Sequence, residues 1–315
     1  MRHALGLVIL VGCSNHTGNG IDAAAVLVDA PAPPPGHHHY VIDRATLPET
    51  NTQARDSALD LDGDGAVDNQ LGMVFSTFAG MGFHLGAAMT NEIDTGKVIM
   101  LADLYAPDLA SAPDATFALY QGSDPMPAAC ASTSDTTCRR HLAGTGTFSI
   151  KASTADPPIA APLLVGLFAG GPGHVTIQLG FGGTPAVVTL VGAHVRLQMP
   201  AETGFSDAIL AGGVVQADVD GKLVPSFRDG FMVRVKQDCT MLSSPPGCGC
   251  VAETGGKTFI GLYDADHNCD ISVEEVRKNP LTMSLLAPDV MVEGMPALSL
   301  GVKVSAVRGG FVAPQ

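Results

Sequence analysis

Residues 174–199 have the sequence HVTIQLGF-GGTP-AVVTLVGAHVRLQM, and this stretch decides the fold class. Two runs rich in β-branched and apolar residues flank the Gly-Gly-Thr-Pro segment. Such runs, bounded by Gly and Pro, are typical of β-strands joined by a turn. Similar runs occur earlier, over 98–101, 116–120, 146–150 and 163–168. Regular alternation of strand and turn predicts a mainly β protein with a β-sandwich or jelly-roll-like body and a few helices.

The composition agrees with a β-rich protein and restricts its partners. The chain has 37 Gly, 22 Pro and no Trp, which indicates many turns, and its hydrophobic content of 46% is enough to build a core. It has 17 Lys and Arg against 31 Asp and Glu, a formal net charge of -14. Phosphate binding needs basic patches, so a nucleic-acid partner is disfavoured.

Helical spacing lies on both sides of the strand-rich part. Apolar residues recur every three or four positions over 69–82, which predicts an amphipathic helix with Asp68 as its N-cap. A second short helix is expected over 85–94, and a third over 208–236. The alternating stretch 297–304 is expected to return to the sheet as a last strand.

The sequence DADHNCDISVEE at 264–275 has the spacing of a calcium loop. Calcium binds six to eight oxygens, and a twelve-residue loop supplies them from positions 1, 3, 5, 7, 9 and 12. Here these positions hold Asp264, Asp266, Asn268, Asp270, Ser272 and Glu275. An apolar approach at 258–263 and a helix-prone exit at 273–278 flank the loop. The segment closely resembles the loop of the EF-hand family, which implies that Asp270 binds through its backbone carbonyl and Glu275 through both carboxylate oxygens.

One position departs from that family. Cys269 stands at position 6, where the family uses glycine because the backbone turns there with a positive φ. A residue with a Cβ pays about 1 kcal/mol for this conformation. A disulfide from Cys269 to Cys248 or Cys250 could offset this cost by clamping the turn. Ile271 stands at position 8, where the family keeps an apolar residue that packs against a paired loop.

A second acidic loop, DLDGDGAVDNQL, spans 60–71. It resembles the Asp-x-Asp-Gly-Asp-Gly segments of extracellular calcium repeats, which implies a calcium shell supplied by Asp60, Asp62, Asp64, the Ala66 carbonyl and Asp68. Position 12 is Leu71, so the bidentate ligand is missing and another carboxylate must complete the shell. Asp56 is close enough in sequence to do so. The alternative is a turn of Asp and Gly residues that leads into a capped helix.

The N-terminus has the form of an export signal. Arg2 is followed by an apolar run over 4–11, which is too short to span a bilayer as a helix. The sequence LVGC at 10–13 resembles the bacterial lipobox, whose cysteine is acylated and becomes the mature N-terminus. The resemblance implies a lipid anchor at Cys13, and Ser14 after it implies sorting to the outer membrane. The alternative is an ordinary signal peptide that is cleaved slightly later.

Export to an oxidising compartment favours disulfides among the other six cysteines. These are Cys130, Cys138, Cys239, Cys248, Cys250 and Cys269. Cys130 and Cys138 bracket a short loop and form the natural pair. Cys248 and Cys250 are too close to pair with each other, so one is expected to reach Cys269 and the other Cys239. A four-cysteine zinc site is the competing interpretation, but two C-x2-C knuckles are lacking.

These features divide the chain into six segments. The Pro-rich tether cannot pack into a core, and His37, His38 and His39 at its end are expected to be solvated, because no acidic or cysteine partner stands near them in the sequence. The alternative is weak binding of a transition metal by these histidines. The expected segments are a signal peptide (1–12), a tether (13–39), an acidic loop with helices (40–96), a β body with a helix near its end (97–237), a cysteine-rich segment with the EF-hand loop (238–290), and a C-terminal strand (291–315).

No catalytic motif occurs in the sequence: it lacks Gly-x-Ser-x-Gly, His-Glu-x-x-His, Walker and dinucleotide-binding patterns. The layout resembles uncharacterised bacterial lipoproteins with EF-hand domains. That resemblance implies a non-enzymatic surface lipoprotein in which calcium has a structural role. The alternatives are a calcium-dependent adhesin or carbohydrate-binding module with a glycan or protein partner on the surface, although the lack of Trp argues against a sugar platform, and a secreted hydrolase.

Overall fold

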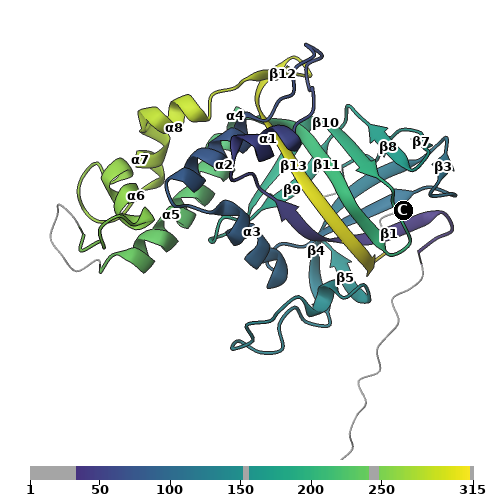
Figure 1. The fold of residues 1–315 in the computed structure, drawn as a ribbon, viewed down its shortest axis with the longest axis horizontal. Helices are drawn as coiled ribbons and strands as arrows, with labels where there is room; N and C mark the ends of the chain where they lie inside the picture. The colour runs from purple at the N-terminus through teal and green to yellow at the C-terminus, as the bar shows by residue number, and fades with distance from the viewer. Residues whose placement is uncertain (1–32, 152–155, 241–247, 313–315) are drawn as a thin grey trace, which may run out of the picture.

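The body of the protein is one sheet of 13 strands within the described residues (Figure 1). The computed structural model describes residues 33–151, 156–240 and 248–312. The long strand β13 (Met295–Gly310) lies at the centre. It is antiparallel to β11 (Gly204–Val215) on one side and to β1 (His37–Thr46) on the other. The predicted C-terminal strand is therefore present, and it forms the middle of the sheet.

An arm of strands extends from each side of this centre. Beyond β11 lies β10, and beyond β1 lie β2 and β4, all antiparallel. Short strands complete the edges, and β5 is parallel to the end of β13. The bounds are β2 (Met100–Tyr105), β3 (Ser111–Ala112), β4 (Thr116–Met126), β5 (Gly146–Ile150), β6 (Ile159–Ala160), β7 (Leu163–Leu164), β8 (Leu167–Gly170), β9 (Val175–Leu179), β10 (Ala186–Gln198) and β12 (Val290–Val292).

The sheet curls so that its two arms face each other across the core. Phe117 of β4 packs near Phe168 of β8, with ring centroids 6.4 Å apart. Gln178 of β9 accepts a hydrogen bond from the Ile99 backbone (3.0 Å) and donates one to Gln121 of β4 (3.5 Å). These contacts bury apolar side chains from both arms between two facing layers. The mainly β prediction is confirmed, in a sandwich-like arrangement.

Residues 208–215 form part of strand β11, so the helix predicted over 208–236 begins too early. Their sequence AILAGGVV is apolar at nearly every position, and all but the last residue are buried. A strand buried on both faces shows no alternation, so periodicity alone does not distinguish it from a buried helix. Helical structure starts at Gln216 and continues through the π-helical turn η2 (Val219–Leu223) into α5 (Val224–Asp238).

The tether prediction is wrong for its last three residues, because His37, His38 and His39 begin β1. The segment expected over 40–96 also contains a strand that was not predicted, since β1 continues to Thr46. Gly36 makes the turn with φ of 81°, and an added Cβ there would lie 2.9 Å from the Tyr105 ring. Pairing with β2 then gives the histidine backbone regular partners, which composition alone could not reveal.

Two of the predicted helices are confirmed close to their expected bounds. They are α2 (Gln70–Gly80) and α3 (Leu85–Asp94), and they pack against β13 and β1. The N-cap of α2 is Asn69 and not Asp68, because the Asn69 side chain accepts the Gly72 N–H at 2.9 Å. The other helices are α1 (Asn51–Asp56), α4 (Gln216–Asp218), the 3₁₀ turn η1 (Arg140–Leu142), α6 (Gly255–Tyr263), α7 (Val273–Lys278) and α8 (Pro280–Leu285).

An aromatic cluster joins the sheet to the helices α5 to α8, which lie at one end of the molecule (Figure 1). Phe78 of α2 meets Phe231 of α5 edge to face, with centroids 5.4 Å apart. Phe231 also stacks on Phe259 (4.4 Å) and Tyr263 (5.1 Å) of α6. Aromatic pairs of this kind add about 0.5–1.5 kcal/mol beyond their buried area. The core therefore continues from the sheet to Tyr263, the residue before the acidic loop.

Candidate metal centres

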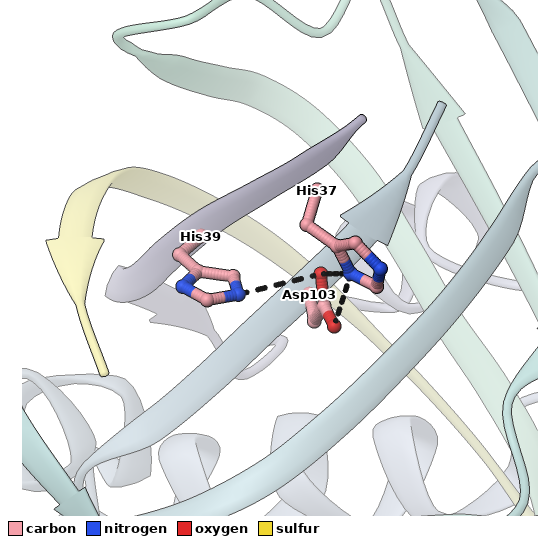
Figure 2. Close-up of side chains that lie close together, drawn as sticks. All are labelled: His37, His39 and Asp103. Atoms are coloured by element: carbon pink, nitrogen blue, oxygen red, sulfur yellow. Dashed lines mark hydrogen bonds and ion pairs between the residues drawn. The ribbon is translucent and has the colours of Figure 1, made fainter. Parts of the chain in front are cut away.

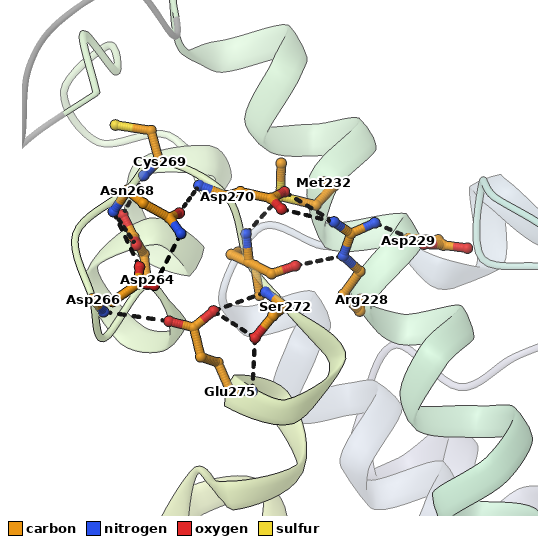
Figure 3. A network of polar contacts seen from close by, with 11 residues as sticks. Arg228, Asp229, Met232, Asp264, Asp266, Asn268, Cys269, Asp270, Ser272 and Glu275 are labelled. Atoms are coloured by element: carbon orange, nitrogen blue, oxygen red, sulfur yellow. Dashed lines mark hydrogen bonds and ion pairs between the residues drawn. The ribbon is translucent and has the colours of Figure 1, made fainter.

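The loop at 264–275 lies between helices α6 and α7, as an EF-hand requires (Figure 3). Ser272 is the N-cap of α7, and its hydroxyl accepts the Glu275 N–H at 3.1 Å. The Glu275 carboxylate in turn accepts the Ser272 N–H at 2.8 Å. This reciprocal capping box fixes the start of α7 and, with it, the place of the Glu275 side chain.

Three carboxylates converge at the mouth of this loop. Oxygens of Asp264, Asp266 and Glu275 lie within 4.8 Å of one another. Glu275 closes the loop, because its Oε1 accepts the Ala265 N–H at 2.8 Å. Burial acts to raise the pKa of Glu275, but the hydrogen bonds from Ser272, Ala265 and Asp266 outweigh it and lower that pKa. The carboxylate is thus ionised at neutral pH and directed at the loop interior.

Cys269 adopts the turn expected at position 6, with φ of 67°. Its N–H donates to Asp264 Oδ2 at 3.0 Å, and its sulfur bonds to Cys248. Asp264 is 4% exposed, so this buried carboxylate is held by the loop backbone around it. The predicted disulfide clamp on the turn is therefore present, and Cys248 is the partner.

The side chains of the remaining three predicted ligands point in different directions. Asn268 lies inside the loop, where its Oδ1 accepts the Asp270 N–H at 2.7 Å. The Ser272 hydroxyl binds Glu275. The Asp270 side chain turns outward to Arg228, 2.9 Å away, as Figure 3 shows. The EF-hand resemblance implies a ligand through the backbone carbonyl at position 7, and an outward side chain there is compatible with that expectation.

Helix α5 occupies the place where an EF-hand loop usually meets its paired loop. Ile271 at position 8 is fully buried, and its N–H donates to Met232 Sδ at 3.3 Å. Its carbonyl accepts a hydrogen bond from Arg228 Nε. Arg228 and Met232 therefore satisfy the backbone groups of Ile271. Sequence reasoning missed both residues, because nothing in their spacing connects them to a loop 40 positions away.

The loop at 60–71 has the same backbone pattern as the EF-hand-like loop. Positive φ values occur at its positions 4 and 6, Gly63 (80°) and Gly65 (88°), matching His267 (58°) and Cys269 (67°). Asp60 Oδ2 accepts the Gly65 N–H at 3.0 Å, as Asp264 accepts that of Cys269. Two segments about 200 residues apart thus share one loop geometry.

Asp68 takes the place of the missing position-12 carboxylate in this second loop. Oxygens of Asp60, Asp62 and Asp68 lie within 4.8 Å of one another. Asp68 Oδ2 accepts the Leu61 N–H at position 2 (2.8 Å), the bond that Glu275 makes to Ala265 in the other loop. Leu71 is fully buried in α2 as a core residue.

Two other predicted contributors to the second loop, Asp64 and Asp56, do not join this cluster. The Asp64 side chain accepts the Ala66 N–H at 2.7 Å, and neither Asp64 nor Asp56 is among the described carboxylates that converge. Burial raises the pKa of Asp68, and the negative charges of three nearby residues, Asp62, Asp289 and Asp64, raise it further. The hydrogen bond from the Leu61 N–H acts in the opposite direction and lowers that pKa. Excess negative charge of this kind is what a bound divalent cation offsets.

The donor atoms at both loops fit a hard cation. Carboxylate, amide and backbone oxygens are the ligands that Ca²⁺ prefers, and the described part of the chain has no free thiolate to bind a softer metal. All six cysteines of the described residues are paired, as Cys130–Cys138, Cys239–Cys250 and Cys248–Cys269. The expected first pair is confirmed, the open choice among the other four is resolved, and the four-cysteine zinc site is wrong.

The chain matches no protein-family model, no curated protein and no solved structure. The predicted signal peptide (1–12) and lipidated Cys13 lie outside the described residues. Among the residues that are described, no single helix is long and apolar enough to cross a membrane, whereas α2 and α3 pass together by length and composition as a pair bent by 102°.

Proposed function

We propose that this protein is a non-enzymatic, exported lipoprotein that binds two calcium ions as structural elements. The observation that supports this best is the shared geometry of the loops at 60–68 and 264–275. In each, three acidic side chains converge, positions 4 and 6 have positive φ, and a carboxylate closes the loop onto the N–H of position 2. Such loops select calcium by supplying oxygen ligands from a preformed turn.

The fixed surroundings of the loops favour a structural role over calcium sensing. A sensor must open a helix pair when calcium binds. Here the Cys248–Cys269 disulfide, the capping box of α7 and the Arg228 contact hold the EF-hand-like loop at three places. Outside the cell, calcium is near millimolar, so sites of modest affinity stay filled and stabilise the native state continuously.

Export and membrane attachment rest on the sequence at 1–13. Three disulfides among the described residues agree with an oxidising compartment. Acyl chains on Cys13 would hold the protein firmly at a membrane surface. Metabolic labelling with radioactive palmitate in a bacterial host tests this part: we expect label on the wild-type chain and none on Cys13→Ala. An unlabelled wild-type chain would contradict the lipid anchor.

Thermal unfolding in calcium and in excess chelator tests the structural role. A site held at 100 times its Kd adds about 2.7 kcal/mol to stability, so calcium should raise the melting temperature by several degrees. Glu275→Gln should lose part of that rise. Glu274→Gln is the matched control, because Glu274 is exposed and pairs with Arg277 and Lys278 outside the loop. A melting temperature that does not change in chelator would refute the proposal.

A further inference from the structure

A polar cluster that contains histidines, unlike the acidic loops, lies on the sheet (Figure 2). His37 and His39 are two residues apart on β1, so their side chains share one face of the sheet. The neighbouring strand β2 places Asp103 directly opposite His39 in the register. Two imidazoles and one carboxylate thereby meet at the beginning of the first described strand.

The spacing of these three side chains matches that of ligands around a small cation. His37 Nδ1 lies 3.0 Å from each Asp103 oxygen, and His39 Nε2 lies 3.7 Å from Asp103 Oδ1. The three ligand atoms lie within 4.8 Å of one another. Tetrahedral zinc with bonds near 2.0–2.1 Å separates its ligand atoms by about 3.3 Å. The separations from Asp103 to the two histidine rings bracket that value.

An ion pair with Asp103 does not explain why the His39 ring is buried. Its side chain is 2% exposed and stacks on Phe311, with ring centroids 4.1 Å apart. Asp103 and the Phe311 backbone lie near the ring, but neither ring nitrogen makes a hydrogen bond of normal length and angle. A buried polar group without a partner costs about 1–3 kcal/mol. A ligand at Nε2 would remove that cost for one of the two ring nitrogens.

We propose that His37, His39 and Asp103 form a binding site for a transition-metal ion of the zinc class. Imidazole nitrogen with one carboxylate suits zinc, whereas calcium prefers all-oxygen sites. Three protein ligands leave one position of a tetrahedral ion open, as in zinc sites that bind water or a small anion. The His37 side chain is 31% exposed, so the site is reached from solvent. It is separate from both acidic loops and shares no residue with them.

His38 between the two ligands provides a matched control on the same strand. Its ring lies on the other side of β1, where Nε2 meets the Ala106 carbonyl at 2.9 Å and Nδ1 lies 3.2 Å from Glu202. These partners are not part of the cluster. Replacing His38 therefore removes one histidine from the same tripeptide without removing a ligand.

Zinc titration by calorimetry on the full-length chain tests the proposal, after chelator treatment and with calcium kept in excess. We expect one zinc site in the wild type and in His38→Gln. His37→Gln and Asp103→Asn should each raise the Kd by more than about tenfold, since even outer-shell changes reach that size. His39→Ala should abolish binding, with circular dichroism confirming that the variant is folded. Replacing zinc with Co²⁺ should give visible absorption bands that the ligand variants lack.

Two results would overturn the site. One is a wild-type chain that takes up no zinc while calcium is in excess. The other is zinc binding that survives unchanged in folded His37→Gln and Asp103→Asn, or that His38→Gln weakens equally, because the binding residues would then lie elsewhere. His37→Gln keeps the test decisive even if His39→Ala does not fold, since the His37 side chain is 31% exposed and tolerates replacement better.

Discussion

At the scale of the residue, Cys269 combines a strained backbone with a covalent clamp. Its φ of 67° costs about 1 kcal/mol for a residue with a Cβ. The bond to Cys248 outweighs this, since a native disulfide contributes about 2–5 kcal/mol. The turn thus keeps the positive φ expected at position 6 without glycine.

This balance predicts the outcome of replacing the disulfide. In a Cys248→Ser background, Cys269→Gly should be more stable than Cys269→Ala by about 1 kcal/mol, because only glycine adopts this φ without strain. Both double variants should be less stable than the wild type. Chemical denaturation in calcium measures the difference, and an alanine variant that equals or exceeds the glycine variant would show that the turn is unstrained.

The proposed calcium site of the second loop depends most on Asp68, which closes the loop onto the Leu61 N–H. We expect Asp68→Asn to weaken calcium binding there, because the amide still accepts the Leu61 N–H but removes a negative charge from the cluster. Asp56→Asn is the matched control and should leave the affinity unchanged. Calcium-dependent shifts in melting temperature compare the two variants. If the shift became smaller in Asp56→Asn and stayed unchanged in Asp68→Asn, the closing carboxylate would be Asp56.

Spacing in the sequence was enough to predict which acidic side chains share each loop, because residues of one loop follow the chain at fixed intervals. It could not show that Asp68 at position 9 replaces the carboxylate of position 12. That substitution depends on how the chain folds back onto Leu61, a three-dimensional property. The expectation that His37 and His39 lack an acidic partner was wrong for a similar reason, since Asp103 comes from a neighbouring strand.

At the scale of the element, helix α5 acts as the partner of the EF-hand-like loop. Arg228→Ala should weaken calcium binding at 264–275 by roughly tenfold, because a hydrogen bond from a charged group contributes about 1.5–3 kcal/mol. The site at 60–68 should not change. Arg234→Ala on the same helix is the control, since Arg234 pairs with Asp238 and not with the loop.

Calcium titration of both arginine variants gives the comparison. An equal effect from Arg234→Ala would mean that α5 stabilises the loop only by general packing. Neither arginine could be assigned from the sequence, where α5 appears only as an apolar pattern. Part of strand β11 was predicted as a helix, because its burial on both faces removes the alternation that identifies a strand.

At the scale of the whole molecule, a buried carboxylate joins α3 to the turn between β9 and β10. Glu92 is 1% exposed, and its Oε1 accepts the Gly182 N–H at 2.7 Å while Oε2 has no partner. Burial raises the pKa of Glu92, against the opposing effects of the Gly182 N–H and Lys97. The ionised form is therefore penalised in the folded state.

The sign of this penalty sets a pH dependence. A carboxyl whose pKa is raised on folding lowers stability progressively as pH rises above its unfolded pKa, here near 4.5, until the folded pKa is passed. Glu92→Gln should remove that decline, so its stability gain over the wild type should grow with pH. Denaturant unfolding across this pH range measures it, with Glu253→Gln, at an exposed position, as control. A gain independent of pH would contradict the assignment.

The mainly β class followed from strand and turn patterns, because local sequence dictates both. The central place of β13 and the curl of the sheet did not, since they depend on pairing between strands far apart in the chain. The aromatic cluster continues from α2 to Tyr263, so both acidic loops adjoin one core. Calcium at either loop should therefore stabilise the whole fold in one transition.

Calorimetric titration of the full-length chain with calcium tests the central claim most directly. We predict two saturable sites in the wild type, one in Glu275→Gln, one in Asp68→Asn, and none in the double variant. Glu274→Gln should retain both. A wild-type chain that binds no calcium at millimolar concentration, or a folded double variant that binds as the wild type does, would contradict the account.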